Sequence, residues 1–295
     1  MIVNPRAGVS LTQPDIQQAV RVLREAGWQL ELATTEAGGH ATELAKQAVE
    51  EGCQVVIACG GDGTINEVLQ PLVGTEAILA VIPKGTVNAF AREVGLPRQP
   101  VAAAGALLTA RARTLDVGQV DGRYFLLWAG VGFDAEVVRM VEAGRRPQLG
   151  ILPFILPTIG AIITFDGVKT RIKLDGKPTQ RTILMAVVSN AHRYALFELS
   201  PEARPDDGVL DLCLFTGSGL ATKVLHIARF LLGRHLGSPG VHYCRVKEAS
   251  FQPDTPLPVQ VDGEFVGITP VTCRIVPQSL RVLLPTDVPA GGKGA

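Results

Sequence analysis

The segment that most constrains the fold is the nine-residue string GGDGTINEV, Gly60 to Val68, which directly follows the apolar run Val55–Cys59. An apolar run that ends in glycines and passes into a helix-forming segment predicts a buried strand, a tight turn and a helix. The turn exposes backbone N–H groups at a helix N-terminus, where phosphate groups bind. The string therefore predicts an α/β domain that carries a phosphate-binding loop.

Glycine suits this loop for two reasons. A side chain would hold phosphate oxygens too far from the amides, and such loops often need a positive φ. Asp62 repels phosphate unless a cation lies between them, so the loop predicts a nucleotide bound together with Mg²⁺. Neither standard phosphate fingerprint is complete here, and the plainer alternative is a tight strand-to-helix turn with Thr64 as N-cap.

A second glycine pattern, GVGFDA from Gly130 to Ala135, follows the apolar run Tyr124–Ala129 and matches G-x-G-x-x-A. Short glycine patterns recur by chance, and no alternation of strands with helices surrounds this one. We therefore do not expect it to bind a dinucleotide.

The two halves of the chain have different predicted secondary-structure patterns. Up to about Arg113, helix-forming stretches alternate with short apolar runs, as a parallel sheet with crossover helices requires; the stretches are 13–26, 40–51, 64–72 and 101–110, and the runs are 30–33, 55–59 and 78–82. After Leu115, Asp-Gly pairs separate β-rich runs, which predicts hairpins in an antiparallel sandwich or barrel; the pairs begin at 121, 175, 207 and 262. We expect an α/β nucleotide-binding domain at 1–115, an all-β antiparallel sandwich domain at 116–285 and a disordered tail at 286–295.

Composition excludes one class of partner. Twenty-eight basic residues balance 28 acidic ones, so no global field attracts nucleic acid, and any attraction to a membrane is local. The five cysteines are scattered and lack C-x-x-C spacing, which indicates reduced thiols of a cytoplasmic protein. The segment Met1–Pro5 enters a predicted strand at once, so we expect no signal peptide.

Four further segments accompany GGDGTINEV in a fixed order: NPRAG at 4–8, PKGTVNAFAR at 83–92, DDGVLD at 206–211 and VDGE at 261–264. Together they resemble the diacylglycerol kinase catalytic family, which includes bacterial lipid kinases and sphingosine kinases. The resemblance covers nearly the whole chain, and Ala7 in place of the family's serine is one departure. It implies a Rossmann-like, phosphofructokinase-like ATP-binding domain followed by a β-sandwich lipid-substrate domain.

The resemblance places ATP against the residues Asn4, Thr35, Gly60, Gly61, Asp62, Gly63, Thr64, Ile65, Asn66, Glu67, Thr86 and Asn88. From the residues alone, several of these have plainer roles as turn formers or helix caps. Glu67 can be an acid that the helix dipole favours. Lys84 is either a solvated surface charge or a phosphate ligand.

The turn Asp262-Gly263 is followed by a second acid, Glu264, and two carboxylates at a turn tip can supply a base and its orienting or metal partner. The resemblance implies that Glu264 accepts a proton while Asp262 assists, although the residues alone do not separate the two roles. Asp62 completes the expected catalytic set, because Mg²⁺ beside it would neutralise phosphate charge. For Asp262, a plain hairpin turn is the alternative.

A metal site is also implied by the resemblance. In bacterial members of the family the matching D-D-G turn binds a structural Mg²⁺, which here would take the carboxylate of Asp207 and the backbone carbonyls of Arg204 and Val209. Oxygen ligands at this loose spacing suit a hard cation. The stretch 190–199 lacks the glycines that often precede this turn in relatives, and a simple turn is the alternative.

Two segments suggest a lipid acceptor. Leu149–Phe165 is an apolar run that contains two prolines and is shorter than the ~20 residues a spanning helix needs, so we expect it to line an acyl cleft or rest on a membrane. Leu220–Leu236 predicts a basic amphipathic helix, with apolar 225, 227, 230, 231 and 232 and basic 223, 229, 234 and 235. A buried core segment is the alternative for the first, and a core-covering helix for the second.

The sequence therefore predicts an ATP- and Mg²⁺-dependent lipid kinase that is cytoplasmic and peripheral at a membrane surface. It transfers phosphate directly to a lipid hydroxyl, without a covalent protein intermediate. The sequence does not decide whether the acceptor is diacylglycerol, phosphatidylglycerol or a sphingoid base. It also does not decide whether the protein is a homodimer. The alternatives are an NAD kinase, which shares a G-G-D-G-T loop, and a non-catalytic lipid-binding protein.

Overall fold

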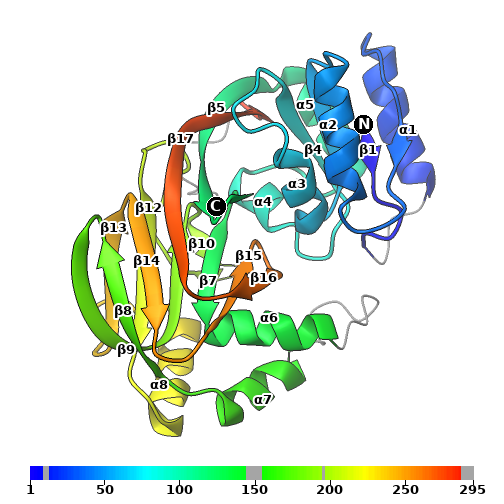
Figure 1. Ribbon diagram of the computed structural model, residues 1–295. Helices are drawn as coiled ribbons and strands as arrows, with labels where there is room; N and C mark the ends of the chain where they lie inside the picture. The colour runs from blue at the N-terminus through cyan, green and yellow to red at the C-terminus, as the bar shows by residue number, and fades with distance from the viewer. Residues whose placement is uncertain (9–12, 144–154, 195–196, 287–295) are drawn as a thin grey trace. The chain divides into compact units, whose positions relative to one another are not determined.

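A computed structural model of the chain describes residues 1–8, 13–143, 155–194 and 197–286 (Figure 1). The chain forms two compact units: the first holds Met1–Asp116 and the segment that begins at Gln278, and the second holds Val117–Pro277. The sequence placed 116–285 in the second domain, but the end of strand β17 (Val271–Leu284) returns to the first unit, where Arg281 and Val282 pair with a parallel strand. Beyond Thr286, the expected tail lies outside the described residues.

The first unit is built on parallel strands in the order β17, β4, β3, β1, β2. Their bounds are β1 (Ile2–Val3), β2 (Ala33–Thr34), β3 (Val55–Gly60) and β4 (Ile78–Pro83). Strands β3 and β4 are buried on both faces, since consecutive residues such as Val56 and Ile57 are almost inaccessible. This pattern is typical of a parallel sheet covered by helices on both sides, so the predicted α/β class is confirmed.

Helices connect these strands. They are α1 (Gln13–Glu25), α2 (His40–Glu50), α3 (Asp62–Leu69), α4 (Ala89–Glu93) and α5 (Pro100–Thr109). The core joins α1 and α5 to strands β3, β4 and β17 through residues such as Leu23, Ile57 and Leu107. The predicted helices formed within a few residues of their expected limits, but the N-cap of α3 is Gly61 rather than Thr64.

The second unit is an antiparallel sandwich. Besides the first part of β17, its strands are β6 (Arg123–Phe125), β7 (Trp128–Gly132), β8 (Val168–Leu174), β9 (Lys177–Ser189), β10 (Arg193–Tyr194), β11 (Phe197–Glu198), β12 (Leu210–Thr216), β13 (Val241–Val246), β14 (Glu248–Pro253), β15 (Pro258–Val261) and β16 (Glu264–Ile268). The long strand β9 pairs with β7, β8 and β12, and strand β15 pairs with β7 and β16. Strand β5 (Arg111–Val120) leads the chain into this unit.

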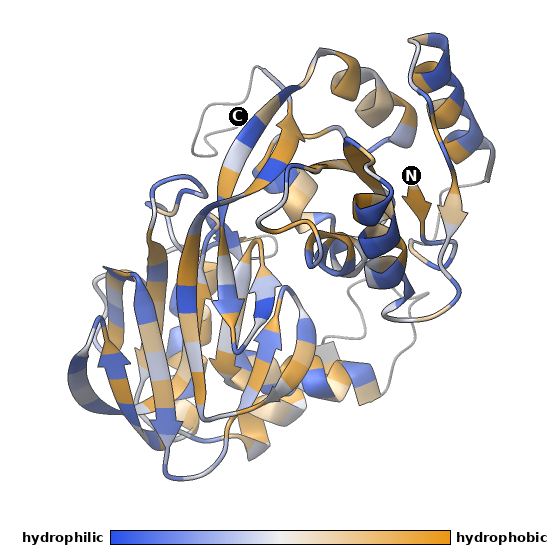
Figure 2. Cartoon of the chain, turned by 45° about the horizontal axis from the view of Figure 1, so that its top comes forward, coloured by the Kyte–Doolittle hydropathy of each residue, from blue (hydrophilic) through white to orange (hydrophobic). Residues whose placement is uncertain are grey.

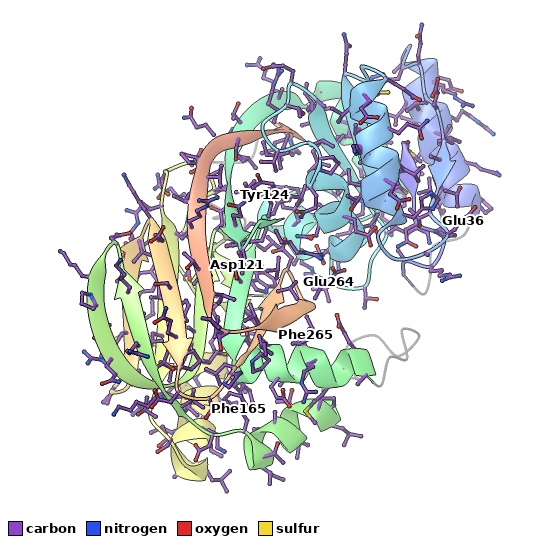
Figure 3. The ribbon with its side chains drawn as sticks, viewed as in Figure 1. Glu36, Asp121, Tyr124, Phe165, Glu264 and Phe265 are labelled. Carbon is purple, nitrogen blue, oxygen red and sulfur yellow. The ribbon has the colours of Figure 1, made fainter. Side chains whose placement is uncertain are left out.

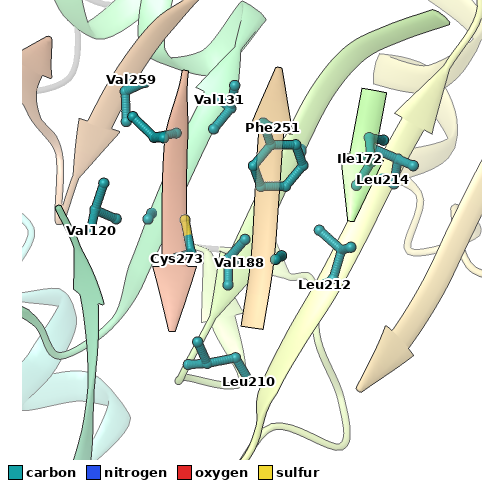
Figure 4. Packing of buried hydrophobic residues seen from close by; sticks show 14 of the residues in the cluster. Val120, Val131, Ile172, Val188, Leu210, Leu212, Leu214, Phe251, Val259 and Cys273 are labelled. Carbon is teal, nitrogen blue, oxygen red and sulfur yellow. The ribbon is translucent and has the colours of Figure 1, made fainter. Parts of the chain in front are cut away.

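Alternating side chains of these strands form a separate core, in which Phe251, Leu212 and Cys273 are fully buried (Figure 4). The colouring by hydropathy shows the same alternation along the strands (Figure 2). Three Asp-Gly pairs have positive φ at both residues, with φ of 45° and 97° at Asp121 and Gly122, as two-residue hairpin turns require. The fourth pair differs, since only Gly208 has a positive φ and the pair precedes β12 in a loop.

Helices α6 (Phe133–Ala143), α7 (Ile155–Thr164) and α8 (Leu220–Leu231) also belong to the second unit, so it is not purely β. The sequence predicted only α8 among them, because its apolar positions repeat at helical spacing. No helix within the described ranges is both long enough and apolar enough to cross a bilayer.

The core of the second unit predicts the effect of one substitution. Phe251→Ala should reduce the free energy of unfolding of this unit by about 3–5 kcal/mol, because a fully buried ring leaves a cavity. The measurement is urea unfolding followed by Trp128 fluorescence in a Trp28→Phe background, since the chain has only these two tryptophans. The matched control, Ile268→Ala at a 58% exposed position, should change it by less than about 1 kcal/mol. An equal loss in both variants would contradict this packing.

Candidate functional site

Three loops of the first unit lie at the carboxyl ends of neighbouring parallel strands. They follow β1, β3 and β4 and contain residues 4–8, 60–64 and 84–88. The carboxyl edge of an open parallel sheet is where ligands bind in α/β proteins. Most of the predicted ATP-binding residues lie on these loops or on α3, and Thr35 follows the neighbouring strand β2.

The glycines of these loops serve close packing. A Cβ atom on Gly60 would overlap the side chain of Thr64, and one on Gly85 would lie 2.6 Å from the Cα of Gly61. None of Gly60, Gly61 and Gly63 has a positive φ, so that part of our expectation was wrong. Gly61 and Gly85 are therefore needed because the two backbones approach closely, and Gly60 is needed because it lies against the Thr64 side chain.

Two asparagines stabilise these loops, one between two loops and one within a single loop. The Asn4 side chain donates a hydrogen bond to the Thr64 hydroxyl at 2.9 Å, which joins the β1 loop to the start of α3. The Asn88 side chain accepts from the Gly85 N–H at 2.7 Å and donates to the Gly85 carbonyl at 2.9 Å. Asn88 has a φ of 51°, and it forms the N-cap of α4.

Lys84 is buried, so it is not the solvated surface charge that the sequence left as one alternative. It is 5% exposed, and its Nζ donates to the carbonyls of Ala7 at 2.6 Å, Pro5 at 3.3 Å and Asn4 at 3.5 Å. The ammonium group therefore holds the β1 loop in place and sets a positive charge beneath the cluster of loops. A buried positive charge at this edge favours an anionic ligand.

Asp62 anchors a second helix. Its two carboxylate oxygens accept the backbone N–H groups of Ala89 and Phe90 at the start of α4, both at 3.0 Å. Burial raises the pKa of this carboxyl above its usual range, while the N–H groups of Ala89 and Phe90 and the charge of Arg92 oppose the shift. A carboxylate at a helix N-terminus is favoured by the helix dipole, so the bonds stabilise its charged form.

Glu67 has a similar role for another helix. Its Oε2 accepts the N–H of Ala41 at 3.0 Å, and its backbone carbonyl accepts the Thr42 hydroxyl at 2.9 Å. Glu67 therefore caps α2, a role that was neither the nucleotide contact implied by the resemblance nor the alternative of an acid favoured by its own helix dipole. Of the other predicted residues, Thr35 and Asn66 are buried, Ile65 is a core residue and Thr86 is exposed.

In the second unit, Asp262 is bound to backbone amides. Its Oδ1 accepts the N–H groups of Leu127 at 2.9 Å and Trp128 at 3.1 Å, and its Oδ2 accepts that of Leu126 at 3.0 Å. The Asp262 N–H in turn donates to the Trp128 carbonyl at 2.9 Å. The residue therefore fixes the β15–β16 turn to the start of β7, and it is 8% exposed.

Glu264 begins strand β16 beside this turn (Figure 3). Its Oε2 accepts a hydrogen bond from Arg123 Nη2 at 2.6 Å, and 24% of its side chain is exposed. The sequence did not identify Arg123 as a site residue. The only local signal was a basic residue directly after the Asp121-Gly122 turn.

Asp134 is a buried acid that we did not predict. Its Oδ2 accepts from Gln260 Nε2 at 2.9 Å and from the Tyr194 hydroxyl at 3.2 Å, whereas Oδ1 has no hydrogen-bond partner among the described residues. Burial raises the pKa of this carboxyl to about 6, although hydrogen bonds, first that of Gln260, offset part of the shift. The sequence contained the residue only within the GVGFDA pattern.

At the predicted metal site, an arginine side chain, Arg245, lies beside the carboxylate of Asp207. Asp207 Oδ2 accepts a hydrogen bond from Arg245 Nη2, and Oδ1 accepts the Val209 N–H at 3.3 Å. The nearby Asp211 has a buried Oδ2 without a hydrogen-bond partner among the described residues, and burial raises the pKa of this carboxyl, although the hydrogen bond from Tyr243 and the charge of Arg245 oppose the shift. The described residues contain no group of three or more His, Cys, Asp or Glu side chains placed to bind a metal. An oxygen set with one orphaned carboxylate atom nonetheless suits a hard cation.

The predicted lipid-facing helix has its apolar side outward. On α8 and its C-cap residue Leu232, the exposed fractions of Leu220, Val224, Leu225, Leu231 and Leu232 are 47–70%. Two of the four predicted basic residues are buried instead: Lys223 donates to the Phe165 carbonyl at 2.6 Å, and His235 contacts the Leu199 carbonyl at 3.0 Å, whereas Arg234 is exposed. On α7, which contacts α8, Leu156, Ile159 and Ile163 are 50–78% exposed. The segment 149–154 lies outside the described residues.

Comparisons with known proteins agree with this arrangement. The family model described as the diacylglycerol kinase catalytic domain matches residues 1–120, and the one described as the YegS C-terminal NAD kinase beta sandwich-like domain matches residues 128–284. A diacylglycerol kinase of Bacillus subtilis is 30% identical over 97% of this chain and 96% of its own length.

Solved structures agree on the fold. The crystal structure of a candidate diacylglycerol kinase from Bacillus anthracis superposes with a TM-score of 0.83 at 24% identity, over 98% of this chain and 97% of that one. An NAD kinase from Archaeoglobus fulgidus in complex with ATP superposes with a TM-score of 0.55 at 13% identity, over 97% of this chain and 93% of that one.

Asp134 gives a pH-dependent prediction. Its folded pKa of about 6 lies above the ordinary value of 3.8, so its protonated form favours folding below about pH 4, and that stability is lost as the pH rises through 6. Asp134→Asn removes the charged form, so it should raise the free energy of unfolding more at pH 7.5 than at pH 4. Urea unfolding of both proteins at the two pH values measures this difference. An equal increase in the free energy of unfolding at the two pH values, or a decrease only at pH 7.5, would contradict this prediction.

Proposed function

The chain belongs to the diacylglycerol kinase catalytic-domain family, and from this premise we propose that it transfers the γ-phosphoryl group of ATP to a lipid hydroxyl. The kinase assignment rests on the family models and on relatives named diacylglycerol kinase that match almost the whole chain. The observation that carries the proposal is the set of three loops at the carboxyl edge of the parallel sheet, with the Lys84 charge beneath them.

ATP would bind along the residues predicted for it. The first N–H groups of α3 lack partners within the helix, and they can donate to phosphate oxygens. Asn4 and Asn88 hold the surrounding loops, so these amides are positioned before the nucleotide arrives. Thr35, Glu67 and Thr86 are further residues that we propose lie against the nucleotide.

Mg²⁺, when bound, would neutralise phosphate charge beside Asp62. The residue fits this role because each of its oxygens accepts one N–H group and keeps a second lone pair. Its tie to α4 also keeps the carboxylate in a fixed position. We propose that Asp207, with the carbonyls of Arg204 and Val209, holds a second, structural Mg²⁺, for which Arg245 must give up its place.

The proton acceptor in this proposal is Glu264. Asp262 accepts three backbone N–H groups, so its lone pairs are largely used to hold the turn. Glu264 is partly exposed, and its hydrogen bond from Arg123 orients the carboxylate, so it is the acid of this turn that a substrate hydroxyl group can approach. Asp262 assists by positioning Glu264.

The two alternatives receive less support. The NAD kinase similarity is at 13% identity and concerns the fold alone. A non-catalytic lipid-binding protein would have no need of a buried lysine and two anchored acids at one sheet edge. An assay that offers NAD and a total lipid extract with labelled ATP, with mass analysis of the product, separates all three and identifies the acceptor among diacylglycerol, phosphatidylglycerol and sphingoid bases.

The exposed apolar residues of α7 and α8 form what we term the apolar face, made of Leu156, Ile159, Ile163, Leu220, Val224, Leu225, Leu231 and Leu232. An apolar face of this kind on adjacent helices suits the interface of a bilayer, and Arg234 at its margin suits anionic head groups. We propose that the protein acts from the cytoplasmic side as a peripheral membrane enzyme. Its five free cysteines agree with a reducing compartment.

The roles of the two acids predict different consequences. Glu264→Gln keeps the shape and an acceptor for Arg123, so it should lower kcat by about 10²–10⁴-fold with little change in melting temperature. Asp262→Asn removes an acceptor oxygen from the turn, so it should lower both kcat and the melting temperature. The labelled-ATP assay and thermal unfolding measure both, with the exposed Glu248→Gln as control. Activity near that of the control in Glu264→Gln would remove its proposed role.

The apolar face predicts the effect of two polar substitutions. The double variant Leu156→Ser, Ile163→Ser should lower the partition coefficient onto phosphatidylglycerol–phosphatidylcholine vesicles at least about tenfold, because two side chains lose apolar burial. Vesicle sedimentation measures it. The control, Leu32→Ser with Leu108→Ser, changes two exposed leucines of the first unit and should bind like the unmodified protein. Equal binding by both double variants would contradict the proposal.

A further inference from the structure

The GVGFDA pattern has a structural explanation that points to the catalytic turn. It forms the junction between β7 and α6, and Gly130 lies opposite Gln260 in the β7–β15 ladder. A Cβ atom on Gly130 would overlap the carboxylate of Asp134 and lie 2.6 Å from Gln260 Nε2. Gly130 therefore leaves the room in which this acid and this amide meet.

Gln260 connects the buried acid to the turn. It is fully buried, its Nε2 donates to Asp134 Oδ2 at 2.9 Å, and its Oε1 accepts the Gly263 N–H at 2.8 Å. Gly263 is the residue between Asp262 and Glu264. A single side-chain amide therefore spans the distance from the N-terminus of α6 to the backbone beside Glu264.

The charge of Asp134 decides which way this amide points. A carboxylate only accepts hydrogen bonds, so it requires the NH₂ group of Gln260 on its side. The carbonyl oxygen of the amide then faces Gly263, which has a donor to offer. In the reverse orientation, two acceptors would meet at Asp134 and two donors would meet at Gly263. The Tyr194 hydroxyl donates to the same oxygen of Asp134 and does not replace Gln260.

An asparagine at 134 would not make this selection. Its side chain can donate as well as accept, so either orientation of Gln260 would find a partner there. A neutral side chain would also avoid the cost of a buried carboxylate with one unpaired oxygen. The acid at position 134 therefore selects one orientation of the Gln260 amide, and it lowers the free energy of unfolding relative to a neutral side chain.

From this geometry we propose that Gln260 is a positioning residue for Glu264, and that Asp134 fixes the orientation of its amide. The inference rests on the proposed role of Glu264 as proton acceptor. The amide holds the Gly263 N–H, while Asp262 holds the turn to β7, so the backbone that presents Glu264 is fixed from two sides. A displacement of a catalytic group by about 1 Å lowers a rate by about 10²-fold, so small changes at Gly263 should be measurable.

The experiment uses Asp134→Asn, Gln260→Met and a control, Gln119→Met. Gln119 is a buried glutamine of the same unit whose amide accepts from Arg274 instead. The protein is labelled with ¹⁵N-glycine, and the Gly263 amide resonance, kcat and the KM for ATP are measured at pH 7.5. Gly263 is assigned by comparison with a Gly263→Ala variant.

Gln260→Met should move the Gly263 resonance upfield, since its N–H loses its acceptor, and lower kcat at least about tenfold with an unchanged KM for ATP. Asp134→Asn should split or shift the same resonance and lower kcat less, without a lower melting temperature. Gln119→Met should leave the resonance and kcat unchanged. If Gln260→Met does not fold, Asp134→Asn alone decides the matter.

The two proposals fail in different ways. An unmoved Gly263 resonance in folded Asp134→Asn and Gln260→Met overturns the network, whatever the activity. A moved resonance with an unchanged kcat overturns the positioning role. If Glu264→Gln keeps full activity, the proposed proton acceptor is wrong, and the inference falls with it even when the Gly263 resonance responds.

Discussion

Carboxylates that accept backbone N–H groups from another element hold the predicted catalytic segments in place. Asp62 holds the start of α4, Glu67 holds the start of α2, and Asp262 holds residues 126–128. Such bonds are charge-assisted and therefore stronger than those between neutral groups. Because each of them joins two segments, the loops keep their shape before a ligand is present.

These anchors also set the charge of the site. The edge of the first unit at which we propose that the nucleotide binds combines a buried ammonium group, Lys84, with a buried carboxyl group, Asp62, and both are held by backbone atoms. Burial makes such charges costly unless a partner or a ligand compensates them. In the proposed function a triphosphate with a divalent cation would supply compensating charge of both signs, and this would account for an acid and a base at the same sheet edge.

The sequence predicted the fold well where the signal was local. Alternating helices and apolar runs identified the parallel sheet, and Asp-Gly pairs identified three hairpins. It did not predict the contacts that join distant segments: Asp62 and Ala89 lie 27 residues apart, and Arg123 and Glu264 lie 141 apart. It also left open which side of α8 packs inward, because periodicity identifies two faces of a helix without identifying which one is buried.

The most direct test of the account is a crystal structure of the protein with a non-hydrolysable ATP analogue and Mg²⁺. The account predicts triphosphate oxygens bonded to the first N–H groups of α3, between Gly61 and Thr64, with the metal ion next to the carboxylate at position 62. A nucleotide that binds elsewhere, with that turn left empty at saturating ligand, would contradict it.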